Sequence, residues 1–249
     1  AIGYEALSGA VTGGSNVAFG RNAGGSGMTG SDNITIGRCS NNTGASGSNN
    51  ILLGCKSGLY LSSGVDNIAL GRLALGTDTV TGNCNIALGT QAGTKITSGQ
   101  YNVFFGKYAG WGNTSGHCNI AIGCNAGKGI TTATENISIG GLGLQNAAGN
   151  MNVQIGRYGQ HYMCGACNIS LGQNAMQGTT TAADNTGHSN IALGNSAMFY
   201  QKTGDHNIGV GYQALYGTTA GTTGDKNIAL GYHSGKNITS GNSNVAIGE

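Results

Sequence analysis

The stretch Asn85-Ile86-Ala87-Leu88-Gly89 decides the fold, because the chain repeats it from end to end. It is a clean copy of a five-residue motif: Asn, Ile or Val, a mostly small residue, a large apolar residue and Gly. Fourteen copies occur, and eight of the thirteen intervals between successive motif asparagines are 17 residues long. A fixed period of this size is typical of repeat proteins whose units stack on one another. The motif asparagines, taken as position 0 of each repeat, are Asn16, Asn33, Asn50, Asn67, Asn85, Asn102, Asn119, Asn136, Asn152, Asn168, Asn190, Asn207, Asn227 and Asn244.

The three apolar positions of the motif predict a short β-strand. Positions +1 and +3 share one strand face, and their large aliphatic residues predict that this face points inward. Position +2 faces the other way and is mostly small, which indicates a close-packed neighbour, most simply the same strand of another subunit. The predicted subunit-interface residues are Ala18, Ala69, Ala87, Ala121, Ala192, Ala229 and Ala246.

The Gly and Asn positions carry two further predictions. The Gly at +4 predicts a sharp bend with positive φ, which turns the chain back and brings a small residue inward three positions later. The asparagines predict an amide ladder with side chains stacked at the strand spacing of about 4.8 Å. The alternative is N-glycosylation at Asn33, Asn136 and Asn168, which begin formal sequons. The ladder is favoured because the Asn recurs whether or not Ser or Thr follows.

Stacked repeats of this kind predict a parallel β-solenoid of about 14 coils, continuous over residues 1–249 as a single domain. One thin coil buries few large side chains for the residues that it orders, so a single copy is expected to need a further buried face. A trimer about a common axis supplies that face for every coil at once.

The repeat resembles known surface fibres. Asn119-Ile120-Ala121-Ile122-Gly123 and Asn244–Glu249 are similar to the head repeats of trimeric autotransporter adhesins, and Gly211–Tyr216 is similar to 17-residue repeats of phage tail fibres. The resemblance implies a left-handed parallel β-roll, trimerisation, host-surface binding and an extracellular location on a cell or a virion. The adhesin head repeat is shorter than 17 residues. A triangular left-handed β-helix is therefore the alternative, because apolar or small residues also recur about six apart.

Composition excludes several classes of protein. The net charge is +2, so nothing global steers the chain to nucleic acid. Gly accounts for 49 residues but Pro is absent, which excludes collagen. No apolar run approaches the roughly 20 residues of a membrane span. The chain begins in mid-repeat, which predicts a piece of something longer or a mature product.

No catalytic, cofactor or metal residues are predicted. The five histidines are scattered, and acidic residues do not group on one coil. Cys164 and Cys167 form a C-x-x-C near His161, but a zinc site normally needs four ligands. Seven cysteines leave at least one thiol outside any intramolecular pairing, and a Cys39–Cys55 bridge between adjacent coils is conceivable.

Surface aromatic residues and two overlong coils are the candidate contacts with a partner. The extra residues fall in Gln177–His188 and Tyr216–Asp225, and insertions into repeat folds often lie on the binding side. A cell-surface glycan or receptor is the expected partner. The predicted contact residues are Trp111, Tyr108, Tyr200, Tyr212 and Tyr216. Basic residues also follow the motif Gly and acids precede the Asn, which indicates a solvated rim or a stripe for an anionic glycan.

A non-catalytic structural fibre or adhesin segment is the function that these patterns favour. Two alternatives remain open. The absence of an atypical polar coil at either end indicates a fragment of a longer fibre or subunits that stack end to end into a filament. An ice-binding solenoid is the second alternative, although the threonines of this chain cluster in irregular loops and do not form a flat array.

Overall fold

The computed structural model describes residues 1–249 except 10, 26, 44, 147 and 148, and the backbone alone of Ala182. The chain forms two compact units, Ala1–Cys124 and Asn125–Glu249, called here the N-terminal and C-terminal units. Each unit is a parallel β-solenoid, which confirms the predicted fold class. Each described coil has one regular strand, whereas a triangular β-helix would need three.

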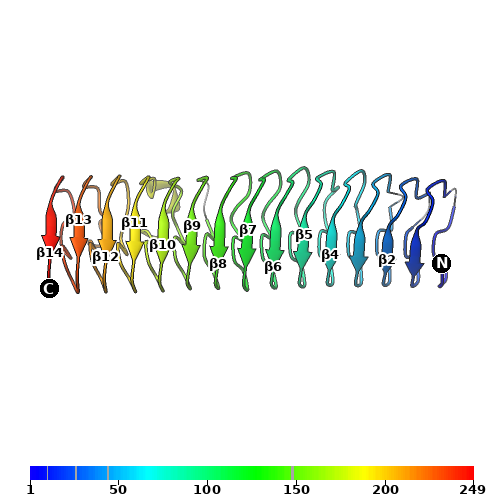
Figure 1. Ribbon diagram of the computed structural model, residues 1–249, viewed down its shortest axis with the longest axis horizontal. Coiled ribbons are helices and arrows are strands. Elements are labelled where there is room, and N and C mark those ends of the chain that lie inside the picture. Colours follow the sequence, from blue (N-terminus) through cyan, green and yellow to red (C-terminus); the bar gives the residue numbers. More distant parts are fainter. Residues whose placement is uncertain (10, 26, 44, 147–148) are drawn as a thin grey trace. The chain divides into compact units, whose positions relative to one another are not determined.

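Every strand is three residues long and occupies positions +1 to +3 of its coil. Neighbouring strands within a unit pair in parallel and in register, so that Ile68 lies beside Ile86 and Leu70 beside Leu88 (Figure 1). The strands of the N-terminal unit are β1 Val17–Phe19, β2 Ile34–Ile36, β3 Ile51–Leu53, β4 Ile68–Leu70, β5 Ile86–Leu88, β6 Val103–Phe105 and β7 Ile120–Ile122. Those of the C-terminal unit are β8 Ile137–Ile139, β9 Val153–Ile155, β10 Ile169–Leu171, β11 Ile191–Leu193, β12 Ile208–Val210, β13 Ile228–Leu230 and β14 Val245–Ile247. One 3-10 helix, η1 Ala182–Asp184, lies in the first overlong coil.

The strand faces are the reverse of the prediction. Position +2 is buried inside the coil in every strand except β14, whereas the large residues at +1 and +3 are all half-buried or exposed. The small residues therefore pack within their own chain and cannot be the contact with a partner. The residues to which this correction applies are Ala18, Ala69, Ala87, Ala121, Ala192 and Ala229, all at most 2% exposed, and Ala246, which is half-buried.

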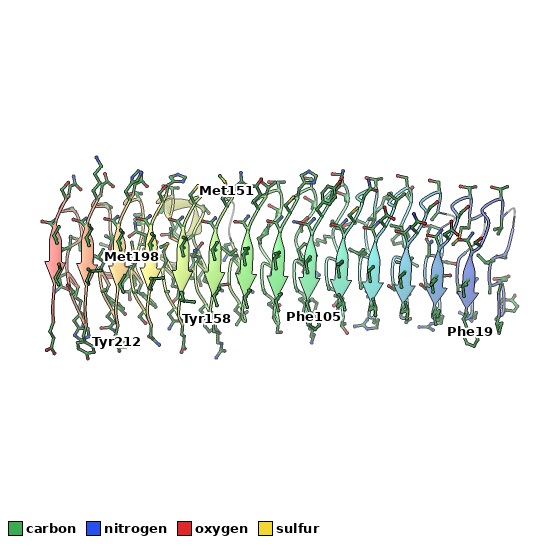
Figure 2. All side chains as sticks on the ribbon, viewed as in Figure 1. Phe19, Phe105, Met151, Tyr158, Met198 and Tyr212 are labelled. Carbon is green, nitrogen blue, oxygen red and sulfur yellow. The ribbon has the colours of Figure 1, made fainter. Side chains whose placement is uncertain are left out.

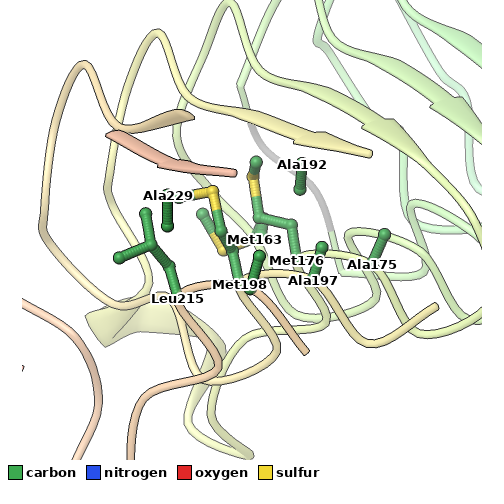
Figure 3. Close-up of a cluster of buried hydrophobic side chains, with 9 residues drawn as sticks. Met163, Ala175, Met176, Ala192, Ala197, Met198, Leu215 and Ala229 are labelled. Atoms are coloured by element: carbon green, nitrogen blue, oxygen red, sulfur yellow. The ribbon is translucent and has the colours of Figure 1, made fainter. Parts of the chain in front are cut away.

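The interior is too narrow for two large side chains from each strand. In most coils a small residue at +2 and a small residue at +7 are both buried in the interior, and the rest of the coil adds one or two larger apolar side chains, such as Ile96. In the C-terminal unit Met176, Met198 and Leu215 fill this role beneath Ala192 (Figure 3). The prediction that the residue three after the Gly turns inward is confirmed for the buried Ala92 and its equivalents.

Phe104 shows how the interior accommodates an exception. It occupies position +2 and is fully buried, while its neighbour Phe105 is 56% exposed. Gly93 and Gly110 stand at position +8, where some other coils carry larger residues such as Leu75, and a Cβ on Gly93 would lie 2.8 Å from the Phe104 ring. Two glycines thus make room for one ring, so the prediction that Phe105 is the core residue is wrong.

The predicted asparagine ladder is present in both units. The backbone N–H and side-chain Nδ2 of Asn50 both donate to Oδ1 of Asn33, at 2.9 and 3.0 Å. Asn50 Nδ2 also donates to the Gly64 carbonyl at 2.9 Å, which closes its own coil. The side chains of the sequon residues Asn33, Asn136 and Asn168 are buried, so folded coils do not present them for glycosylation.

A second ladder, not predicted from the sequence, follows position −2. Here a side chain of the following coil accepts a hydrogen bond from a backbone N–H of the preceding coil. The Ser31 backbone N–H, for example, donates to Ser48 Oγ at 3.0 Å. His188 donates to Asp205 Oδ1, and Asp205 donates to Asp225 Oδ1 at 2.8 Å. In the asparagine ladder the acceptor lies in the preceding coil, so the two ladders run in opposite directions, and both join successive coils just before the strand.

The Gly at +4 is required for two reasons. Its φ lies between +118° and +137° in all copies, a region that side chains of L-residues rarely adopt, so the predicted bend is confirmed. A Cβ on Gly89 would also lie 2.7 Å from the backbone of Gly106 in the next coil. Close approach of successive coils therefore depends on this glycine.

Replacing Gly89 by Ala should lower the free energy of unfolding by roughly 2–5 kcal/mol, because backbone strain and a clash with the next coil add together. Gly14→Ala is the matched control, since nothing lies within 4 Å of its added Cβ, and we expect a change within about 0.5 kcal/mol. Urea unfolding measures both. Equal midpoints for the two variants would contradict this account of position +4.

Adjacent leucines test the reversed strand faces. Leu52 is fully buried inside the coil and Leu53 is half-buried on the outside. Leu52→Ala should cost roughly 2–5 kcal/mol at every protein concentration, because it leaves a cavity in the core. Leu53→Ala should cost little in the single chain, and any larger loss should grow with protein concentration. Concentration-independent losses of equal size would show that both leucines belong to one core.

Candidate interaction surfaces

The outer side of the strands carries an apolar face, defined here as positions +1 and +3. Every residue at these positions in the fourteen strands is Ile, Val, Leu or Phe, and none is buried. Figure 2 shows Phe19 and Phe105 in the N-terminal unit, at the lower, arrowhead ends of their strands. The most exposed members are Val17, Phe19, Ile36, Phe105, Ile155, Ile169, Leu171, Leu230, Val245 and Ile247.

An uncovered apolar face is unusual for a parallel sheet. Parallel strands normally have both faces covered and read as nearly continuous apolar runs. The strand Ile86-Ala87-Leu88 is such a run, with Ala87 covered by the coil interior and its neighbours partly open to solvent. Large contiguous apolar patches on soluble proteins mark interaction sites. The outer faces are therefore candidate interaction surfaces.

An aromatic cluster lies on the C-terminal unit, away from the strands. Phe199 stacks on Tyr216 with ring centroids 5.2 Å apart, and Tyr200 meets Tyr216 edge-on at 5.3 Å. These residues occupy positions +9 and +10, directly after the buried Met198 and Leu215. Burial raises the pKa of Tyr216, and the neighbouring Tyr200 adds to that effect. Two of the predicted contact residues, Tyr200 and Tyr216, thus come together.

A second aromatic group stands at position +5. Tyr212 and Tyr232, on consecutive coils, stack with centroids 5.3 Å apart and an interplanar angle of 15°. Tyr232 also contacts His233 at 4.0 Å. Tyr212 is 43% and Tyr232 52% exposed, so this pair is open to solvent. Tyr232 was not among the predicted contacts, although it repeats the position of Tyr212 one coil later.

The other two predicted contact residues, Trp111 and Tyr108, belong to the N-terminal unit. Lys95 Nζ, from the preceding coil, lies 3.9 Å from the centroid of the Trp111 ring. Lys107 Nζ stands 5.2 Å from the Tyr108 ring. A lysine ammonium group therefore lies over each of these rings. A planar ligand would have to displace Lys95 to reach that side of Trp111.

The first insertion is ordered by its own polar contacts. The amide of the buried Asn185 bonds Thr179 and the Tyr162 carbonyl, at 2.7 to 3.1 Å. Lys202 of the next coil forms an ion pair with Asp184 at 3.6 Å. The second insertion is tied back by a parallel bridge between Gln201 and Thr222. Both insertions are therefore parts of the fold as well as candidate contacts.

The cysteine and histidine residues do not assemble into a metal site within the described part of the chain. Cys164 donates to the Asn146 carbonyl and His161 Nδ1 contacts the Leu142 carbonyl, so the C-x-x-C and its nearby His face separate backbone groups. The described residues contain no disulfide, and Cys39 and Cys55 are both free thiols. Arg38 Nη2 lies 3.5 Å from Cys55 Sγ, and this contact raises the pKa of the guanidinium.

No family model, curated protein or solved structure matches this chain.

Among the described residues, no helix is both long and apolar enough to cross a membrane.

The titration of Tyr216 should report the aromatic cluster. Its phenolate is disfavoured by burial first and by Tyr200 second, so Tyr216 should ionise above the ordinary tyrosine pKa of 10.0. Tyr216→Phe should remove this late step from an absorbance titration, and Tyr200→Phe should move it to lower pH. An unchanged late step in both variants would show that the cluster is open in solution.

Proposed function

We propose that this chain is a segment of an extracellular structural fibre or adhesin, at a cell surface or on a virion. It is non-catalytic and assembles through its apolar face into a trimer of identical chains. The apolar face is the observation that carries the proposal. Burying the exposed part of one such side chain is worth up to about 1 kcal/mol, and each strand offers two large apolar residues.

A second copy of the same chain fits this face better than an unrelated protein. The outer residues recur at the strand spacing of about 4.8 Å along each unit, always large and apolar. A partner that follows this face must repeat at the same spacing, and another copy of the solenoid does so. Three faces turned toward one axis cover one another, which supports the trimer that the resemblance to adhesin heads implies.

The aromatic groups of the C-terminal unit support an adhesive role beside the structural one. Tyr212 and Tyr232 present stacked rings at the surface, and Phe199, Tyr200 and Tyr216 form a second cluster on neighbouring coils of the same unit. Aromatic rings with polar edges suit sugar rings and receptor side chains alike. A cell-surface glycan or receptor is therefore the external partner that we propose.

Charges on the apolar face should separate the copies. Leu70→Glu with Leu88→Glu places two carboxylates among half-buried aliphatic residues of adjacent strands and leaves the buried Ala69 and Ala87 unchanged. The expected result in light scattering after gel filtration is a trimer for the unaltered chain and a monomer for the variant.

Thr79→Glu is the control, because Thr79 is exposed away from the strands, in the coil of Leu70. It should leave the trimer mass unchanged, and electron microscopy should show fibre-like particles. A monodisperse monomer of the unaltered chain at every concentration would contradict the proposal.

A further inference from the structure

The apolar face has two edges of different chemistry. Position −1, just before the motif Asn, forms one edge, and position +5, just after the motif Gly, forms the other. Figure 2 shows this in the C-terminal unit, where Met151 at −1 and Tyr212 at +5 lie beyond opposite ends of the strands. Position −1 is held in a left-handed conformation, with φ of 56° at Met151, and its side chains are almost all exposed.

Opposite charges face outward at the two edges of the same coils in the N-terminal unit. The coil of Asn33 carries Asp32 at −1 and Arg38 at +5, and the coil of Asn67 carries Asp66 and Arg72. All four are exposed. The one ion pair among the described residues is Lys202 with Asp184, so neither acid is paired within its own chain.

Two further coils of this unit place matching groups at their edges. Tyr101 and Lys107 flank the coil of Asn102, an arrangement suited to a cation–π contact. Cys118 and Cys124 flank the coil of Asn119, and both are exposed. No described coil of the N-terminal unit carries like charges at −1 and +5.

We propose that copies of this chain join edge to edge through the N-terminal unit, in a closed ring whose axis runs along the solenoid of that unit, each of its coils meeting the same coil of the neighbouring copy. The −1 edge of one copy then meets the +5 edge of the next. Asp32 pairs with Arg38 of the neighbouring copy, Asp66 with Arg72, and Cys118 lies against Cys124. This inference rests on the proposed function and adds the orientation, the register and the residues that set both.

The symmetry of the assembly determines which charged residues of neighbouring copies meet. Rotation about an axis along the solenoid leaves every coil at its own height, so a closed ring brings together the two edges of one coil. A two-fold axis across the solenoid would instead bring acid edge to acid edge. A slip by two coils would pair Asp32 with Arg72, but slipped contacts do not close into a ring.

Cysteine cross-linking tests the register directly. Cys118 and Cys124 cannot bond within one chain, because strand β7 separates them by about 10 Å and a disulfide needs Cα atoms within about 7 Å. The other five cysteines are replaced by Ser. Oxidised glutathione is the oxidant: the two protein thiols form one disulfide, and glutathione leaves as two reduced thiols.

The expected result on a non-reducing gel is a ladder that ends at the ring size, three for a trimer. Cys118→Ser alone and Cys124→Ser alone should give no cross-link, whereas the two variants co-expressed should give a linked dimer and nothing larger. A dimer from Cys124→Ser alone would show that like edges meet. A chain that keeps only Cys84 and Cys124 should not cross-link, and a ladder from it would establish the two-coil slip.

Charge reversal gives an independent readout. Asp66→Lys and Arg72→Glu should each weaken association roughly fivefold or more, because an attraction becomes a repulsion at every interface. The double variant D66K/R72E should restore it to within about twofold, because the pair is re-formed with its charges exchanged. Lys at position −1 is compatible with the fold, since Lys226 holds that position with φ of 57°.

Asp78→Lys is the matched control, with the same charge change on an exposed residue at position +11 of the coil of Asp66. It should leave association unchanged. If the unaltered chain is a trimer but the double variant does not recover, the edge pairing is wrong and the apolar interface stands. A monomeric unaltered chain would instead overturn the proposed function itself.

Discussion

The close approach of successive coils is the constraint on which the rest of this structure depends. At position +4 a glycine with φ near +130° lies so near the glycine of the next coil that a Cβ would collide with its backbone. The bend sends the chain back beneath its strand and leaves a narrow interior that holds small residues and one or two larger side chains in each coil. Ala87 and Ala92 meet inside, while Ile86 and Leu88 are left outside. An apolar outer surface therefore follows from the narrowness of the coil.

Polar groups carry much of the cohesion that such a thin core cannot supply. Most motif asparagines bond the motif Asn of the preceding coil and the backbone carbonyl of the glycine that closes their own coil, as Asn50 does. At position −2 the side chains of Ser, Asn, His and Asp also join successive coils, because each accepts a hydrogen bond from a backbone N–H of the preceding coil. A carboxylate or an imidazole at this position is thus explained by backbone bonding and needs no catalytic role.

The sequence was sufficient for the repeat, the strand position, the bend and the asparagine ladder, because each depends on local chemistry that recurs in every copy. The direction of the strand faces was not accessible in the same way. Alternation separates +2 from +1 and +3, but all three are apolar, so the pattern does not say which face is inside. Phe104 and Phe105 illustrate this: one ring is core and the other surface, and the glycines beside the buried ring, Gly93 and Gly110, hold a position that is also glycine in coils with Ala at +2.

The candidate surfaces were partly predictable for a related reason. Tyr200 and Tyr216 were predicted as partner contacts because both lie near the overlong coils, and the structure brings their rings into contact, which was not predicted. Tyr232 was missed, although position +5 of successive coils must bring it beside Tyr212. Aligning every column, polar and aromatic as well as apolar, would have found it. The second ladder could have been found similarly, since −2 is rich in acceptors, but its variable chemistry hid the common function.

The overlong coils have a consequence of their own. Asn190 bonds Asn168 and Ile191 lies beside Ile169 although 22 residues separate each pair, five more than in the regular coil. The interval from Asn207 to Asn227 behaves in the same manner with 20. Extra length between positions +9 and −3 is thus looped out without disturbing the stack. Foreign peptides grafted there would be displayed at a chosen height on the solenoid, with neighbouring windings serving as an unaltered scaffold.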